Sequence, residues 1–199
     1  DYHILSVIDS GGMGRVYEAE RQGQVFAVKE IKDTFRDARD RQDAINRFMA
    51  EALTLARLKH PNIPVIHRNF VENGRYYLVT DWIEGQDLRN LMVQRLNRPL
   101  PEEQVLDWAL QLCDVLEYLH GQNPPIIFRD LKPSNIILRR DGRLVLVDFG
   151  IAKLFTPGQQ GTLIGTPGYA AMEQYQGLAD PRSDIYGLGV TLYFLLTGR

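Results

Sequence analysis

The chain has 199 residues, of which 44% are hydrophobic and 24% are charged, and its formal net charge at pH 7 is −2. This composition is typical of a soluble globular protein with a substantial core, and the near-neutral charge gives no reason to expect binding to nucleic acid or to an anionic membrane surface. A single cysteine excludes an internal disulfide bond and favours a reducing, cytoplasmic location. The longest apolar stretch, residues 186–196, is too short to cross a bilayer.

The first part of the chain, residues 1–80, is predicted to be rich in β-strands. Short runs of β-branched and aromatic residues are broken by glycines, and Asn73-Gly74 is a strong signal for a tight hairpin turn. The expected strands cover residues 2–8, 16–20, 25–31, 65–70 and 76–80. Apolar residues at helical spacing predict one helix over residues 37–59, which Pro61 ends.

The rest of the chain is predicted to be mainly helical. A long helix over residues 100–120 begins with Pro101 and two glutamates and ends before a glycine, as helices commonly do. Trp108 and Cys113 are expected to fill the core on its buried side. The last segment is expected to be a hydrophobic helix with Ser183 as its N-cap.

Two acidic residues, Asp130 and Asp148, flank a predicted hairpin. The residues between 136 and 147 indicate two short strands joined by an Asp-Gly turn. Because a hairpin brings its ends together, Lys132 and Asn135 are expected to lie close to both acids. Two carboxylates, an amide oxygen and an ammonium group suit an oxygen-seeking metal such as magnesium that holds a polyphosphate.

The acids belong to two motifs, Ile-Ile-Phe-Arg-Asp-Leu-Lys-Pro-Ser-Asn at residues 126–135 and Asp-Phe-Gly at residues 148–150. With these motifs the chain resembles the protein kinase family, and within it looks most like the bacterial serine/threonine kinases of eukaryotic type. The resemblance implies that Asp130 accepts the proton of the substrate hydroxyl and that Lys132 steadies the transferred phosphoryl group. The implied cofactors are ATP and Mg²⁺, and the implied metal ligands are Asn135 and Asp148.

The resemblance also implies the fold. It is α+β and bilobal, with a small β-rich N-lobe that has one helix and a larger, mainly helical C-lobe. We expect the N-lobe at residues 1–80, the hinge at 81–85 and the C-lobe at 86–199. The family fold continues past the last residue, so we expect a piece of a longer parent, whose attachment to a membrane is left open. Without the following helices, the helix at residues 184–196 is expected to expose an apolar face.

A glycine-rich turn links the first two expected strands. Glycines let backbone N–H groups approach phosphate oxygens, although most such turns only close a hairpin. Lys29, fifteen residues after Gly14, strengthens the phosphate interpretation because the family has the same pair of features. The implied catalytic residues are Asp130, Lys132, Asn135, Lys29 and Glu51, the last of which pairs with Lys29 as an activity switch. The implied nucleotide-binding residues are Gly11, Gly12, Gly14, Val16, Ala27, Lys29, Thr80, Asp81, Ile83, Ile137 and Asp148.

Three positions depart from the family pattern. Asp9 stands where the first glycine of the loop is usual, Phe128 replaces a histidine, and Met172 replaces a proline. Phe128 is expected to serve as a packing element in place of the histidine ring. Met172 is expected to loosen a turn without touching a reacting atom.

Residues 148–173 resemble the activation segment of the family. Arg129 is expected to dock a phosphorylated residue of this segment, and autophosphorylation is expected first at Thr162 and second at Thr156. Thr166 is expected to bond the catalytic aspartate and lysine and to shape the site for the acceptor.

The function that follows from the resemblance is transfer of the γ-phosphoryl group from magnesium ATP to serine or threonine hydroxyls of protein substrates. The alternative is a pseudokinase, a nucleotide-responsive binding module, which Asp9 and Phe128 favour. A third interpretation, a small-molecule phosphotransferase, shares the acidic residues, but the segment at residues 165–169 argues against it because it shapes a peptide site in the family.

Overall fold

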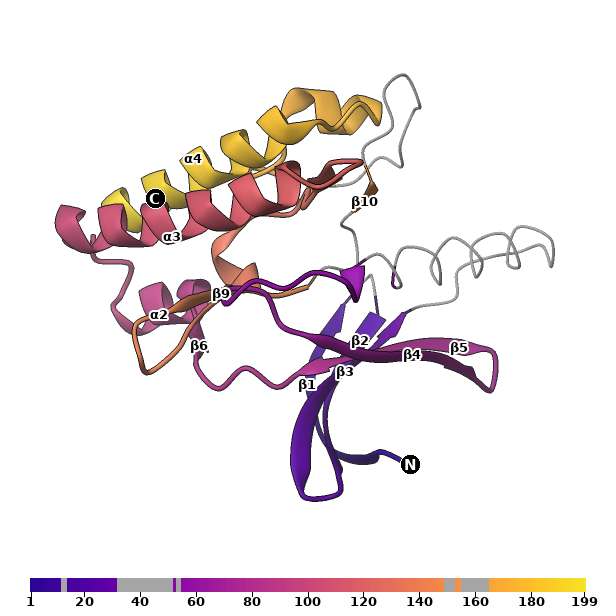
Figure 1. Cartoon of the computed structure of the whole chain (residues 1–199). Helices are drawn as coiled ribbons and strands as arrows, with labels where there is room; N and C mark the ends of the chain where they lie inside the picture. The colour runs from indigo at the N-terminus through magenta and orange to yellow at the C-terminus, as the bar shows by residue number, and fades with distance from the viewer. Residues whose placement is uncertain (12–13, 32–51, 53–54, 149–152, 155–164) are drawn as a thin grey trace. The chain divides into compact units, whose positions relative to one another are not determined.

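The structure is a computed structural model that describes residues 1–11, 14–31, 52, 55–148, 153–154 and 165–199 (Figure 1). The chain divides into two compact units, one made of residues 1–59 and 64–83 and the other of residues 60–63 and 84–199. Most of the helix expected at residues 37–59 lies outside the described residues. In the part of the chain that the structure describes, no helix is both long enough and apolar enough to cross a membrane.

The first unit contains a five-stranded antiparallel sheet. Each strand overlaps one that the sequence predicts, and the strand order is β1-β2-β3-β5-β4. Asn73 and Gly74 have φ angles of 50° and 73° between β4 and β5, so the predicted hairpin turn is confirmed. The strands are β1 (His3–Gly11), β2 (Gly14–Arg21), β3 (Gln24–Ile31), β4 (Ile66–Glu72) and β5 (Arg75–Asp81).

The two faces of this sheet carry different side chains. Phe26 and Val28 of β3 belong to a small buried core, against which half-buried aromatic residues pack. Lys29 alternates with them along β3 and therefore projects from the opposite face. The core consists of Ala19, Phe26, Val28 and Val79, and the aromatic residues over it are Tyr2, Tyr17, Phe70 and Tyr77.

The second unit is mainly helical, with short strands and turns between its helices. Its long helices α3 and α4 lie side by side, and each buries one side of its surface in this unit (Figure 1). The helices are α2 (Leu88–Gln94), α3 (Glu102–His120), α4 (Pro181–Thr197) and the 3₁₀ turns η1 (Pro133–Asn135) and η3 (Met172–Gln176). The strands are β6 (Gln86–Asp87), β7 (Ile126–Ile127), β8 (Ile136–Leu138), β9 (Leu144–Leu146) and β10 (Lys153–Leu154).

Helix α3 confirms the predicted helix and corrects one prediction about its core. Pro101 is its N-cap residue and Gly121 its C-cap. Trp108 is buried, at 3% exposure, as predicted. Cys113 is exposed, so the prediction that it fills the core was wrong. Each residue advances a helix by about 100°, and Cys113 therefore lies off the buried side on which Leu112 sits.

Helix α4 begins earlier than predicted. Its N-cap is Asp180, whose carboxylate accepts a hydrogen bond from the N–H of Arg182 at 2.8 Å, and Pro181 occupies the first turn. Ser183, predicted as the N-cap, is the third residue of the helix, and its Oγ accepts the N–H of Asp180 at 3.1 Å. The prediction was wrong because Ser183 is the helical half of a capping box whose cap lies three residues upstream.

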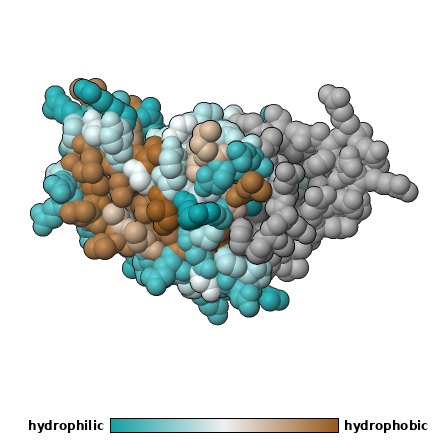
Figure 2. All heavy atoms as spheres, turned by 90° about the horizontal axis from the view of Figure 1, so that it is seen from above, coloured by the Kyte–Doolittle hydropathy of each residue, from teal (hydrophilic) through white to brown (hydrophobic). Residues whose placement is uncertain are grey.

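The expected apolar face is present on α4. The buried side of the helix contains Leu188 and Leu195, whereas large apolar and aromatic side chains on its other side are more than a third exposed. Figure 2 shows hydrophobic residues gathered on the face of the molecule that carries α4. The exposed side chains on α4 are Ile185, Tyr186, Tyr193 and Leu196.

Candidate active site

The predicted hairpin between the two acids is formed by β8 and β9. Ile136 pairs with Leu146, and the N–H of Val147 donates to the carbonyl of Asn135 at 2.9 Å. The ladder therefore continues one step beyond the strands, and Asp148 follows directly after it. The hairpin confirms that the stretch after Asp130 and the stretch before Asp148 meet at its open end.

Asp130 lies at the centre of a buried polar cluster. Its carboxyl group is 3% exposed, and the ammonium group of Lys132 lies 2.7 Å from its Oδ2 atom. The side-chain amide of Asn135 donates to the same oxygen at 3.0 Å and to the main-chain carbonyl of Asp130 at 2.9 Å. Charge-assisted hydrogen bonds of this kind offset the cost of burying a carboxylate. The arrangement holds the Asp130 carboxylate in one orientation.

Thr166 completes this cluster from a segment that is distant in sequence. Its hydroxyl donates to Oδ1 of Asp130 at 2.6 Å and accepts a hydrogen bond from Nζ of Lys132 at 2.7 Å. The prediction that Thr166 bonds the aspartate and the lysine is therefore confirmed. The main-chain N–H groups of Tyr169 and Ala170 donate to the carbonyl of Thr166, at 2.9 and 3.0 Å, and give this segment a tight turn.

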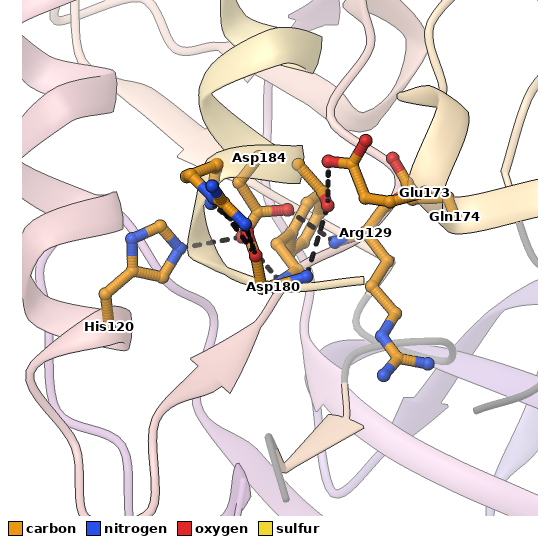
Figure 3. A network of polar contacts seen from close by, with 9 residues as sticks. His120, Arg129, Glu173, Gln174, Asp180 and Asp184 are labelled. Atoms are coloured by element: carbon orange, nitrogen blue, oxygen red, sulfur yellow. Dashed lines mark hydrogen bonds and ion pairs between the residues drawn. The ribbon is translucent and has the colours of Figure 1, made fainter. Parts of the chain in front are cut away.

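The backbone that leads into Asp130 is held by Asp184 of α4 (Figure 3). The N–H of Phe128 donates to Oδ2 of Asp184 at 2.9 Å, and the N–H of Arg129 donates to Oδ1 at 2.7 Å. Nε2 of His120 lies 2.8 Å from Oδ2, and the Asp184 side chain is 0% exposed. Asp184 thus connects the loop before Asp130 to the two long helices.

A second set of contacts comes from η3. The amide of Gln174 donates to the carbonyl of Arg129 at 2.7 Å and accepts the N–H of Ala171 at 3.0 Å. The neighbouring Glu173 accepts a hydrogen bond from the hydroxyl of Ser183 at 2.7 Å, which ties η3 to α4. Figure 3 shows these side chains around the backbone of the loop, with the guanidinium group of Arg129 pointing away from them.

The residues at the open end of the hairpin fit a hard divalent cation. Both hydrogen bonds described for the side chain of Asn135 use its nitrogen, so these bonds leave the side-chain oxygen, the kind of atom that magnesium prefers, for another partner. Asp148 adds a half-buried carboxylate just after the ladder. Among the described residues there is no group of three or more histidine, cysteine, aspartate and glutamate side chains with metal-binding geometry. The donor set is thus one amide and one carboxylate, which suits a metal that shares its shell with phosphate and water.

The first unit arranges its candidate residues through the register of its strands. Lys29 is paired with Val16 on one side and with Leu78 on the other, and Ala27 is paired with Thr80. Because directly opposed residues share a face, these side chains project from the same side of the sheet. Gly11 and Gly14 form the last pair of the β1–β2 ladder. Gly12 and Glu51 lie outside the described residues.

The remaining candidate nucleotide-binding residues lie in two places. Asp81 ends β5, and its carboxylate accepts the N–H of Val65 at 2.9 Å and lies 2.6 Å from Nε2 of His67. Its side chain is thus engaged, its N–H donates to the carbonyl of Val65 at 3.0 Å, and its carbonyl accepts a hydrogen bond from the hydroxyl of Thr80 at 3.4 Å. Ile83 is half-buried in the stretch that follows. Ile137 is half-buried in β8 of the second unit.

The three positions that depart from the family pattern differ in burial. Phe128 is fully buried, at 0% exposure, as expected of a packing element. Met172 is 75% exposed at the start of η3. Asp9 is exposed in β1. The candidate phosphorylation sites Thr156 and Thr162 lie outside the described residues.

Two of the residues that hold the loop were not found from the sequence. Asp184 offered one signal, because an acid on the buried side of a hydrophobic helix needs a polar partner. Gln174 offered none, since a glutamine in a short polar turn is most often solvated. Both contact the loop from more than 40 positions away along the chain.

Comparisons with known proteins point to one family. The model of the protein kinase domain matches residues 2–199. The chain is 37% identical over 213 residues to serine/threonine-protein kinase C of Synechocystis sp. The aligned region covers 100% of this chain and 39% of that protein. It is 37% identical over 204 residues to serine/threonine-protein kinase PrkC of Bacillus subtilis, an alignment that covers 100% of this chain and 30% of that protein. It is 35% identical over 201 residues to serine/threonine-protein kinase Nek1 of Mus musculus, with 98% of this chain and 16% of that protein covered.

The chain thus spans between 16% and 39% of the length of these relatives. Although the relatives are much longer, the family model matches nearly the whole of this chain. The relatives share the family although they come from a cyanobacterium, a second bacterium and a mammal. The chain belongs to the protein kinase domain family.

Proposed function

We propose that the chain is a serine/threonine protein kinase domain that transfers the γ-phosphoryl group of ATP to serine or threonine hydroxyls of proteins. The observation that carries the proposal is the closed set of hydrogen bonds among Asp130, Lys132 and Thr166. It joins a carboxylate, an ammonium group and a hydroxyl from the segment that shapes the acceptor site in the family. The relatives named as serine/threonine kinases support the same acceptor class.

Asp130 serves as the acceptor of the hydroxyl proton. An ionised carboxylate offers about four lone-pair directions, and among the described residues three donors approach it, from Lys132, Asn135 and Thr166. One direction remains for the hydroxyl of the substrate. The bonds from its neighbours fix the carboxylate before the substrate arrives, so little reorganisation is needed at the moment of transfer.

Lys132 supplies positive charge next to that proton acceptor. Its ammonium group has three donors, and the contacts to Asp130 and Thr166 use two of them. The third N–H donor can reach an oxygen of the phosphoryl group while that group passes from ATP to the substrate hydroxyl. Asn135 and Asp148 would hold magnesium, which when bound neutralises phosphate charge and orients the phosphate oxygens.

The first unit would bind the nucleotide. Lys29 would contact the phosphates, with Glu51 as its partner, and Val16 and Ala27 would pack against the adenine ring. The backbones of Asp81 and Ile83 would bond its edge. The register of the sheet supports the part that concerns Lys29, Val16 and Ala27, since the three share a face.

Regulation by autophosphorylation belongs to the same proposal. Arg129 precedes the proton acceptor and would dock a phosphate on Thr162, or second on Thr156. Phosphopeptide mapping of active protein would find one of these threonines modified. Active protein with both threonines unmodified would contradict this part of the proposal and leave phosphoryl transfer untouched.

The proposal is tested by transfer of labelled phosphate from ATP to a mixture of protein substrates. Asp130→Asn is expected to lower transfer by about 10²- to 10⁴-fold, the usual contribution of general base catalysis, with nucleotide affinity unchanged. Asp141→Asn, an exposed change in the same hairpin, is the control and should have no effect. A wild-type protein that binds ATP and transfers nothing would contradict the proposal and favour the pseudokinase.

A further inference from the structure

We propose that Gln174 is a positioning residue for Asp130. It holds the peptide group immediately before Asp130 and connects it to residues 166–171, which we call the acceptor-side segment. This inference rests on the proposed function, because Asp130 is taken as the proton acceptor of phosphoryl transfer. Gln174 itself touches no substrate in this proposal and acts through the backbone of Arg129.

The position of Gln174 is set by two hydrogen bonds of opposite kind. Its side-chain nitrogen donates to the carbonyl of Arg129 at 2.7 Å, and its side-chain oxygen accepts the N–H of Ala171 at 3.0 Å. The residue is 2% exposed, so water has little access to these groups. A buried main-chain group that loses its partner costs as much as its desolvation, which makes both bonds costly to remove.

The carbonyl of Arg129 is an unusual target because this residue has a strained backbone. Its φ angle is +72°, in the left-handed region that residues with a Cβ atom rarely occupy. Such a conformation persists only where the surroundings impose it, and it is common at functional sites. Here the N–H of Arg129 is bonded to Asp184 and its carbonyl to Gln174, so a side chain holds the strained residue on each side.

The division of work between these two side chains follows from the chain order. Asp184 bonds the N–H groups of Phe128 and Arg129 and so fixes the peptide groups before the strained residue. Gln174 bonds the carbonyl of Arg129, which belongs to the same planar peptide group as the nitrogen of Asp130. A rotation of that peptide group would turn the Asp130 side chain, and Gln174 opposes the rotation.

Gln174 also closes a ring of contacts between the proton acceptor and the acceptor-side segment. The carboxylate of Asp130 is bonded to Thr166, whose carbonyl accepts the N–H of Ala170. The next residue, Ala171, donates its N–H to Gln174, which returns to the backbone beside Asp130. A shift of the acceptor-side segment therefore reaches Asp130 both through its side chain and through its backbone.

A primary amide is the group that meets these requirements. One end must donate to a carbonyl and the other must accept from an N–H, at the reach of a glutamine side chain. Methionine matches the length of glutamine but cannot donate. An ionised glutamate keeps the acceptor and places negative charge against the carbonyl oxygen of Arg129. A protonated glutamate restores a donor, which gives a variant whose function can be switched by pH.

The first test compares two glutamines of η3. Gln174→Met is expected to lower kcat for phosphoryl transfer by about tenfold or more, the effect of removing a hydrogen bond to a buried carbonyl near the reacting group, while the KM for ATP stays within about twofold. Gln176→Met is the matched control, since Gln176 is exposed in the same helix. A Gln174→Met enzyme with wild-type kcat would overturn the inference.

The second test uses Gln174→Glu. Burial and the neighbouring carbonyl favour the neutral acid, so lowering the pH from about 8 to about 6 should raise the activity of this variant relative to wild type at the same pH. A purely structural role for Gln174 would lower the amount of folded enzyme without such a profile. A constant ratio across this range would overturn the proposed bond to Arg129, even if the methionine variant failed to fold.

A third measurement does not depend on activity. In Gln174→Met, hydrogen exchange at the N–H groups of Phe128 and Arg129 should be faster than in wild type and in Gln176→Met, because the strained backbone then loses its hydrogen bond from Gln174. Unchanged exchange would overturn the inference, whether or not the protein transfers phosphate. Absence of transfer in wild type would instead contradict the proposed function, so the two failures are distinguishable.

Discussion

Each unit of the molecule contains an aspartate that bonds a histidine and the backbone. In the second unit, Asp184 accepts two main-chain N–H groups and lies 2.8 Å from Nε2 of His120. In the first unit, Asp81 accepts the N–H of Val65 and lies 2.6 Å from Nε2 of His67. The atoms are alike and the burial differs, since the Asp184 side chain is 0% exposed and that of Asp81 is 32% exposed.

The difference shows where each unit needs a side chain to hold its backbone. Asp81 stands at the end of β5, which pairs along its length with β3 and with β4, so the ladder holds this region without it. The loop after β7 has left the strand pairing, and its direction is set by bonds from α4 and η3. A buried carboxylate that takes the place of strand pairing should therefore contribute more to the free energy of unfolding than a carboxylate at an exposed strand end.

The sharpest test of this comparison is a matched pair of substitutions. Asp184→Ala leaves two buried N–H groups without an acceptor and is expected to lower the free energy of unfolding by about 3 kcal/mol or more. Asp81→Ala frees groups that water can reach, and its cost is expected to be about 1 kcal/mol or less. Urea unfolding of both variants gives the two values. Equal losses would show that burial does not separate the two clusters.

This contrast also explains how much the sequence could predict. The hairpin after Asp130 and the strands of the first unit follow from patterns that are local in the chain, such as alternation and turn residues, and these predictions hold. The motif residues around Asp130 were identified by resemblance, as was the contact of Thr166. Asp184 and Gln174 act on the loop from 55 and 45 positions away, and no local pattern specifies such contacts.

The two wrong predictions have a related cause. Cys113 is apolar and lies next to the buried Leu112, but the helical spacing of the buried residues of α3 places the cysteine off the side that faces the core. Ser183 is a favoured N-cap residue, but Asp180 and Pro181 just before it make a better helix start, and the serine then fills the other half of the capping box. In both cases the property of the residue was predicted correctly, but its position relative to the helix was not.

Two glycines of α4 test how tightly the loop is held, with a smaller expected effect. A Cβ atom at Gly187 would lie 3.1 Å from the carbonyl oxygen of Leu131, in the loop after Asp130, whereas one at Gly189 would meet nothing within 4 Å. Gly189→Ala should therefore raise the free energy of unfolding by about 0.5–1 kcal/mol, through the helix propensity of alanine, and leave phosphoryl transfer unchanged.

In Gly187→Ala the same gain is opposed by the contact with Leu131. We expect a free energy of unfolding no higher than that of wild type and a decrease of about tenfold in kcat, since small displacements of reacting groups are costly. Urea unfolding and the transfer assay on both variants check this. A Gly187→Ala enzyme that behaves like Gly189→Ala would show that the loop yields freely and that α4 does not hold it.

The smallest expected effect concerns the cap of α4 and its dependence on pH. The hydrogen bond from the side chain of Arg182 is the largest cause that holds the pKa of Asp180 below its ordinary value, and main-chain N–H groups of Arg182 and Ser183 add to it against the effect of burial. A lowered pKa in the folded protein means that the charged form stabilises the fold. This stabilisation is complete above the ordinary aspartate pKa of about 4 and declines as the pH falls through the lower folded value.

Asp180→Asn isolates that charge, because asparagine is an equally good N-cap residue. At neutral pH the variant should lose about 0.5 kcal/mol of unfolding free energy, the usual contribution of a charge near a helix N-terminus that is partly screened by solvent. The difference from wild type should shrink as the pH falls below about 4, and Arg182→Met should reduce it at neutral pH. A difference that stays constant with pH would mean that the geometry of the cap, rather than its charge, secures the start of the helix that carries Asp184.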